Sequence, residues 1–71
     1  MTTCSRAHEL DVVRLTAQVD RWAPGIEGTV VGEHSEYLLV EIDGPGGVPR
    51  IIDVPRDRAK VIWRARGVQI A

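Results

Sequence analysis

The chain has 71 residues, of which 44% are hydrophobic, and a formal net charge of −1. This length allows one small domain that buries only about 60% of its unfolded surface, and the composition argues against disorder. The single cysteine excludes an internal disulfide. One cysteine and two histidines without paired spacing do not make a structural zinc site, which takes about four ligands.

The N-terminus lacks the apolar segment of a secretory signal. The longest apolar run, Tyr37–Val40, is too short to span a membrane. A lone cysteine fits a reducing compartment. We therefore expect a cytoplasmic protein without a metal or cofactor.

Charge is distributed unevenly along the chain. Residues 1–49 hold three basic and eight acidic residues, a net charge of −5, whereas residues 50–71 hold six basic and two acidic residues, a net charge of +4. The basic C-terminal third is either ordinary solvated surface or a patch for an acidic partner.

The first predicted element is a strand within Asp11–Val19, "DVVRLTAQV", where apolar and polar residues alternate. A helix over Ala7–Val19 is the alternative, because Leu10 and Val13 share a helical face. The density of valine and threonine favours the strand.

The next three predicted strands are Thr29–His34, Tyr37–Asp43 and Arg50–Val54. Gly32 interrupts the first of these and predicts a bulge or a sharp bend, because glycine weakens a regular strand. The glycine- and proline-rich segment Gly44–Pro49 is a loop. It lacks the lysine of a phosphate-binding loop.

The segment "PRDRA", Pro55–Ala59, predicts a single 3₁₀ turn, and Lys60–Ala65 predicts the fifth strand. Trp63 alternates with Val61 there, so we expect it in the core. Five short strands with tight turns indicate an all-β fold that closes into a small, strongly bent, partly open barrel.

The alternation along the strands predicts which residues fill this barrel. The outward-facing apolar residues are then Val12, Leu39 and Ile51, and a contiguous patch of such residues more often marks an interface. The predicted core consists of Val13, Leu15, Val30, Leu38, Val40, Ile42, Ile52 and Val54.

Four blocks of sequence in this order resemble the DUF4926 family of small bacterial proteins of unassigned function. They are Glu9–Thr16 ("ELDVVRLT"), Gly25–Val31 ("GIEGTVV"), Tyr37–Asp43 ("YLLVEID") and Ile51–Ile62 ("IIDVPRDRAKVI"). The resemblance implies an SH3-like barrel and brings no catalytic residue with it.

These observations divide the chain into three parts. We expect a flexible N-terminal tail at residues 1–8, an SH3-like five-stranded barrel at residues 9–63 and a C-terminal extension at residues 64–71.

Catalytic constellations are weak in this sequence. Ser5, His8 and Asp11 contain the residue types of a hydrolytic triad, but a triad is defined by spatial geometry and not by sequence proximity. His34, between two nearby glutamates, is better explained as part of a solvated hairpin tip. We therefore predict that the protein is not an enzyme and takes no small-molecule substrate.

The leading functional hypothesis is a non-catalytic protein-interaction or accessory module, which fold and size suggest by analogy only. Its partner is a second copy, in a dimer at high micromolar concentration, or the product of a neighbouring gene, as in immunity or antitoxin-like proteins. Trp22 is either a lid over the barrel end or a contact residue. The candidate partner-binding residues are Trp22, Tyr37, Leu39, Ile51, Arg64 and Arg66.

The alternative is a nucleic-acid-binding module of the KOW type. The net charge and the scarcity of aromatic residues for base stacking weigh against this alternative. It would use the basic residues Arg56, Arg58, Lys60, Arg64 and Arg66.

Overall fold

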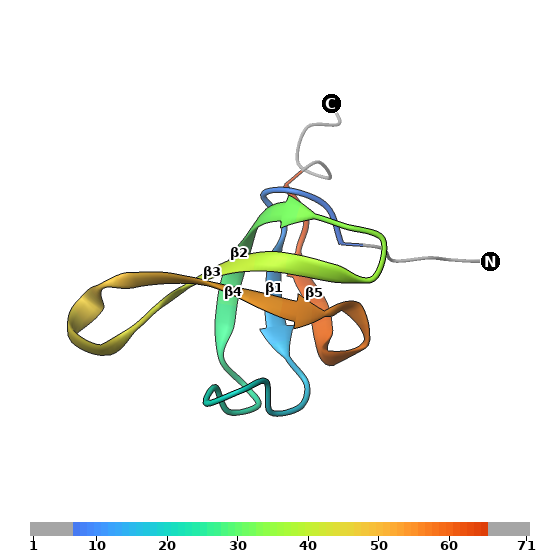
Figure 1. The fold of residues 1–71 in the computed structure, drawn as a ribbon. Helices are drawn as coiled ribbons and strands as arrows, with labels where there is room; N and C mark the ends of the chain where they lie inside the picture. Colours follow the sequence, from blue (N-terminus) through green and yellow to red (C-terminus); the bar gives the residue numbers. More distant parts are fainter. Residues whose placement is uncertain (1–6, 66–71) are drawn as a thin grey trace.

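A computed structural model describes residues 7–65 as one antiparallel sheet of five strands in the order β4-β3-β2-β1-β5 (Figure 1). The sheet bends strongly, and its edge strands β4 and β5 do not pair with each other. The predicted all-β fold of five antiparallel strands in a small, partly open barrel is therefore confirmed. The elements are β1 (Val12–Leu15), β2 (Glu27–Glu33), β3 (Tyr37–Asp43), η1 (Pro45–Gly47), β4 (Pro49–Pro55), η2 (Arg56–Arg58) and β5 (Ala59–Trp63), with η1 and η2 being 3₁₀ turns.

The first strand is shorter than predicted, and the alternative helix is absent from the described part of the chain. β1 ends at Leu15, whose carbonyl accepts a hydrogen bond from the Gly25 N–H at 2.8 Å. This bond closes the connection to β2 at its base. The chain between these residues leaves the sheet and turns at Asp20, whose φ is +56°.

The remaining elements follow the predicted order. β3 has the predicted bounds, and β4 extends one residue further at each end. The turn η2 lies within the predicted Pro55–Ala59, whereas the loop Gly44–Pro49 contains the 3₁₀ turn η1, which the sequence did not indicate. No helix described in residues 7–65 is long and apolar enough to cross a membrane.

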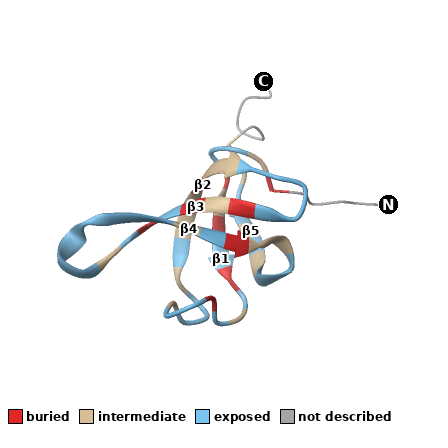
Figure 2. Cartoon of the chain, in the orientation of Figure 1, coloured by how far each residue is buried: buried red, intermediate tan, exposed pale blue. Residues whose placement is uncertain are grey.

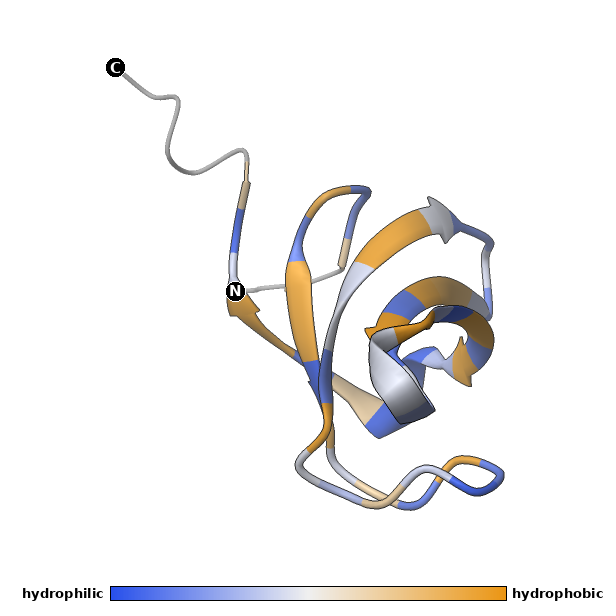
Figure 3. Ribbon diagram, turned by 90° about the vertical axis from the view of Figure 1, so that its left-hand side faces the viewer, coloured by the Kyte–Doolittle hydropathy of each residue, from blue (hydrophilic) through white to orange (hydrophobic). Residues whose placement is uncertain are grey.

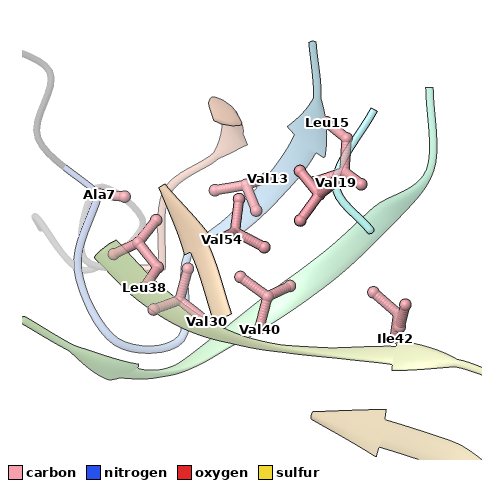
Figure 4. Close-up of a cluster of buried hydrophobic side chains, with 9 residues drawn as sticks. All are labelled: Ala7, Val13, Leu15, Val19, Val30, Leu38, Val40, Ile42 and Val54. Atoms are coloured by element: carbon pink, nitrogen blue, oxygen red, sulfur yellow. The ribbon is translucent and has the colours of Figure 1, made fainter. Parts of the chain in front are cut away.

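The core lies inside the bent sheet, where buried side chains from β1 to β4 point toward one another (Figure 4). Ile52, also predicted in the core, is half-buried and packs against it. Figure 3 shows hydrophobic residues alternating with hydrophilic ones along the strands, and Figure 2 shows the exposed tip of the β3–β4 hairpin. The buried apolar residues are Ala7, Val13, Leu15, Val19, Val30, Leu38, Val40, Ile42 and Val54.

The predicted irregularity at Gly32 is a β-bulge. Val30 pairs with Val40, but Gly32 pairs with Leu39, so Val31 is an extra residue in β2. A bulge increases the local twist, which helps the sheet to curl around its small core.

A second bulge changes the position of Trp63. Val13 pairs with Val61, whereas Val12 pairs with Trp63, so Ile62 is the extra residue in β5. The bulge moves Trp63 to the outer face together with Val12, and the indole side chain is 50% exposed. The prediction that Trp63 lies in the core is therefore wrong, because alternation along a strand reverses across a bulge.

Candidate functional site

A surface hollow of about 190 Å³, here called the Trp22 hollow, brings together the β1–β2 connection, η1 and β4. It combines one aromatic residue, three aliphatic or proline side chains and two guanidinium groups. Its lining residues are Asp20, Arg21, Trp22, Pro45, Arg50, Ile51 and Ile52.

Hydrogen bonds hold Trp22 in place. Its main chain makes a two-way bridge with Val19, with N–H to carbonyl distances of 2.8 and 2.9 Å. Val19 itself is buried in the core, and the Arg58 side chain donates to the neighbouring Gln18 carbonyl at 3.2 Å. Trp22 therefore sits on an ordered connection instead of a free loop.

The sequence left two roles open for Trp22, a lid and a contact residue, and both stay predictions. Trp22 is half-buried and packs against the hydrophobic core, as a lid does. The same residue also lines the hollow. A tryptophan with one face on the core and another at a hollow is well suited to act as an ordered contact residue.

The guanidinium groups of Arg21 and Arg50 have no ion pair or hydrogen bond with any residue from 7 to 65. Both side chains are exposed. The stem of Arg50 passes close to Gly44, where a Cβ would lie 2.7 Å from Arg50 Cγ. The hollow thus presents two unsatisfied cations beside apolar side chains.

The other predicted partner-binding residues are spread over the molecule. Tyr37 stacks on His34 at the β2–β3 turn, with ring centroids 4.4 Å apart. Leu39 is half-buried over Gly32, and Ile51 lies diagonally across from it on β4 with 61% of its surface exposed. Of the five predicted residues that lie within residues 7–65, Trp22 and Ile51 line the same hollow. A dimer through Tyr37, Leu39 and Ile51 stays a prediction.

Arg64 lies at the opposite end of the barrel, where its Nη1 is 3.6 Å from the carboxylate of Asp11. Asp11 is fully buried and also accepts hydrogen bonds from the main-chain N–H groups of His8 and Ala65, at 2.9 and 3.1 Å. This carboxylate ties both ends of the described chain to the barrel. Arg66 lies outside the described residues.

Ser5 of the triad considered above also lies outside the described residues. Asp11 bonds the main chain of His8 and not its ring. The His8 ring instead contacts the Glu33 carboxylate at 3.2 Å. Asp11 and His8 therefore support the N-terminal segment, and their arrangement is not that of a triad.

Glu33 is the second carboxylate that holds this segment. It accepts the Glu9 N–H at 3.1 Å and lies 3.9 Å from the Arg56 guanidinium. The hydrogen bond from Glu9, with smaller effects from His8 and Arg56, lowers the pKa of Glu33 below its ordinary value despite some desolvation.

The basic residues of the C-terminal third are partly engaged within the protein. Arg56 donates to the carbonyls of His34 and Ala7, at 2.9 and 3.1 Å. Arg58 donates to Gln18, and Arg64 lies against Asp11. Three of the five residues proposed for nucleic-acid binding thus have structural contacts of their own.

No protein-family model, no curated protein sequence and no solved structure matches this chain. The resemblance to the DUF4926 family therefore stays an expectation. Among residues 7–65, no group of three or more His, Cys, Asp or Glu side chains could hold a metal ion.

The residues that sequence reasoning missed in the Trp22 hollow are Asp20, Arg21, Pro45, Arg50 and Ile52. Pro45 and Arg50 lie more than twenty residues from Trp22 in the sequence, and no local pattern links them to it. A tryptophan next to an arginine in a predicted connection was the one available signal.

Proposed function

We propose that this chain is a non-catalytic protein-binding module and that the Trp22 hollow is its contact surface. The observation that carries the proposal is a hydrogen-bonded tryptophan beside exposed Ile51 and two arginines without an ion pair among residues 7–65. Aromatic and arginine side chains in a pocket are the groups that dominate binding energy at protein interfaces.

The KOW-type alternative finds less support. Phosphate binding needs cations that are free to displace counterions, whereas Arg56, Arg58 and Arg64 contact carbonyls or a carboxylate inside the protein. The remaining basic residues near the hollow, Arg21 and Arg50, flank apolar side chains, an arrangement better suited to a protein surface.

Site-specific photocrosslinking in the native host tests the proposal. A photoreactive amino acid at Pro45, which lines the hollow and is exposed, should yield a defined protein adduct, and the adduct should disappear when Arg21 is replaced by Glu in the same chain. The matched control places the photoreactive group at Lys60, which is exposed on β5. Equal adducts from both positions, or none from Pro45, would contradict a contact surface at the hollow.

A further inference from the structure

The free edge of β4 exposes a short window of main-chain hydrogen-bonding groups. The Arg56 N–H donates to the Glu36 carbonyl at 3.1 Å, and the Gly44 N–H donates to the Val48 carbonyl at 2.8 Å. In an antiparallel pair, residues that bond to the neighbour alternate with residues that point away. From the register between β3 and β4, the main-chain N–H and C=O groups of Ile51 and Asp53 therefore point toward the free edge.

Prolines border this window on both sides. Pro49 and Pro55 occupy the next outward-pointing positions of β4, and proline has no N–H to donate. Prolines on an edge strand limit uncontrolled pairing with other chains. The edge therefore offers two N–H donors, from Ile51 and Asp53, and accepts only a short added segment.

The Trp22 hollow lies along this edge. Arg50, Ile51 and Ile52 are consecutive residues of β4, and consecutive side chains of a strand point to opposite faces. All three residues line the hollow, as is expected for a hollow along an edge of the strand. Because β3 covers the other edge, the hollow adjoins the free one, next to the outward-pointing main chain of Ile51.

The side chains around the hollow define what can fill it. Trp22, Ile51 and Ile52 offer apolar surface, and Arg21 and Arg50 offer guanidinium groups without partners in residues 7–65. Asp20 is the one acidic residue of the lining. Guanidinium groups bind carboxylates with paired, charge-assisted hydrogen bonds.

We propose that the free edge of β4 binds an extended, acidic segment of a partner protein by strand addition. The segment pairs with the main chain of Ile51 and Asp53. It places an aliphatic side chain against Trp22 and a carboxylate between Arg21 and Arg50. This inference rests on the proposed protein-binding function and adds the mode of binding and the chemistry of the partner.

A second copy of the chain fits this edge less well. If two β4 strands paired antiparallel with Ile51 of each opposite Asp53 of the other, Arg50 would lie opposite Val54. No carboxylate of the second β4 would then meet Arg50. Charge complementarity therefore favours a different, acidic partner.

A peptide selected from a random display library provides the probe. The library displays twelve-residue peptides, and the folded full-length chain is the target. We expect the enriched peptides to combine acidic residues with aliphatic residues at alternating positions, as an added strand requires. A synthetic peptide of the enriched sequence should then slow hydrogen exchange at the Ile51 and Asp53 amides. Enrichment of basic or proline-rich peptides, or no enrichment, would overturn the inference.

Variants of the chain distinguish main-chain pairing at the β4 edge from binding by the side chains of the hollow alone. Ile51→Pro removes one N–H donor from the free edge, at a position equivalent to those of Pro49 and Pro55. The loss of one hydrogen bond should weaken peptide binding by about tenfold. Ile51→Val retains the donor and should bind nearly as well as the original chain. Methylation of the peptide's own edge-facing amides should weaken binding similarly and does not depend on the folding of a variant.

The possible outcomes are distinguishable. If Arg21→Glu with Arg50→Glu abolishes binding but Ile51→Pro and peptide methylation have no effect, strand addition is wrong and the proposed function stands. If neither set of changes affects binding, the hollow is not the contact surface and both proposals fail. Concentration-dependent protection of Ile51 and Asp53 without peptide would identify a second copy as the occupant and overturn the acidic-partner inference.

Discussion

Gly28 in β2 lies directly against the main chain of Glu41 in β3. A Cβ at Gly28 would be 2.6 Å from the Glu41 carbonyl oxygen and 2.6 Å from Ile42 Cγ2. The carbonyl belongs to a paired strand and cannot move aside without disturbing the sheet. The close packing of the bent strands therefore depends on the absence of a side chain at this position.

We expect Gly28→Ala to lower the free energy of unfolding by about 1–3 kcal/mol, the usual cost of overpacking a core. Gly32→Ala is the matched control in the same strand, because its nearest neighbour is the flexible end of the Leu39 side chain. Urea denaturation of both variants provides the measurement. Equal losses for the two substitutions would show that β2 can move away from β3.

Asp11→Asn tests the carboxylate that joins the two ends of the described chain. The buried carboxylate accepts two main-chain N–H groups and lies against Arg64. The amide offers one acceptor oxygen in place of two, so a buried donor is left unsatisfied and we expect a loss of about 1–3 kcal/mol. The control is Asp43→Asn, an exposed residue of β3, and a thermal melt that shows equal effects would contradict this role of Asp11.

The pH dependence of stability should depend on Glu33. Its pKa is lower in the folded protein, chiefly because the Glu9 N–H donates to it. Such a carboxylate stabilises the fold at pH values above its unfolded pKa of about 4.3, and this contribution is lost as the pH falls through the folded pKa.

Glu33→Gln should therefore be less stable than the original chain at neutral pH, and the difference should diminish in acid below about pH 4. Denaturation midpoints measured across this range give the comparison. The control is Glu36→Gln, which changes a carboxylate in the adjacent turn that makes no hydrogen bond or ion pair with residues 7–65. If the stability difference between Glu33→Gln and the original chain grew in acid, the pKa of Glu33 would be raised and not lowered by folding.

Nucleic-acid binding provides a direct test of the alternative function. We expect binding to duplex DNA or RNA no tighter than the ordinary non-specific level, about 10⁻⁴ to 10⁻⁶ M at physiological salt, and steeply weakened by added salt. Fluorescence anisotropy with labelled duplexes is the measurement. Submicromolar affinity that Lys60→Ala reduces without loss of fold would favour the KOW-type reading.

The sequence by itself determined that the chain forms five strands, where they lie along the chain, and most of the core. Alternation along Tyr37–Asp43 placed Leu38, Val40 and Ile42 inside, because the two-residue period of a strand is a local property. A glycine inside a β-branched run is also a local signal, and Gly32 was predicted to mark a bulge or a sharp bend.

Only the tertiary structure decided where Trp63 and the hollow lie. The bulge at Ile62 depends on pairing with β1, and it turns Trp63 outward against the alternation of its own strand. The hollow unites Trp22 with Arg50 and Ile51, which are brought together by the turn at Val19 and by the course of β4. Pairing between distant strands sets these contacts, and periodicity within one strand carries no information about them.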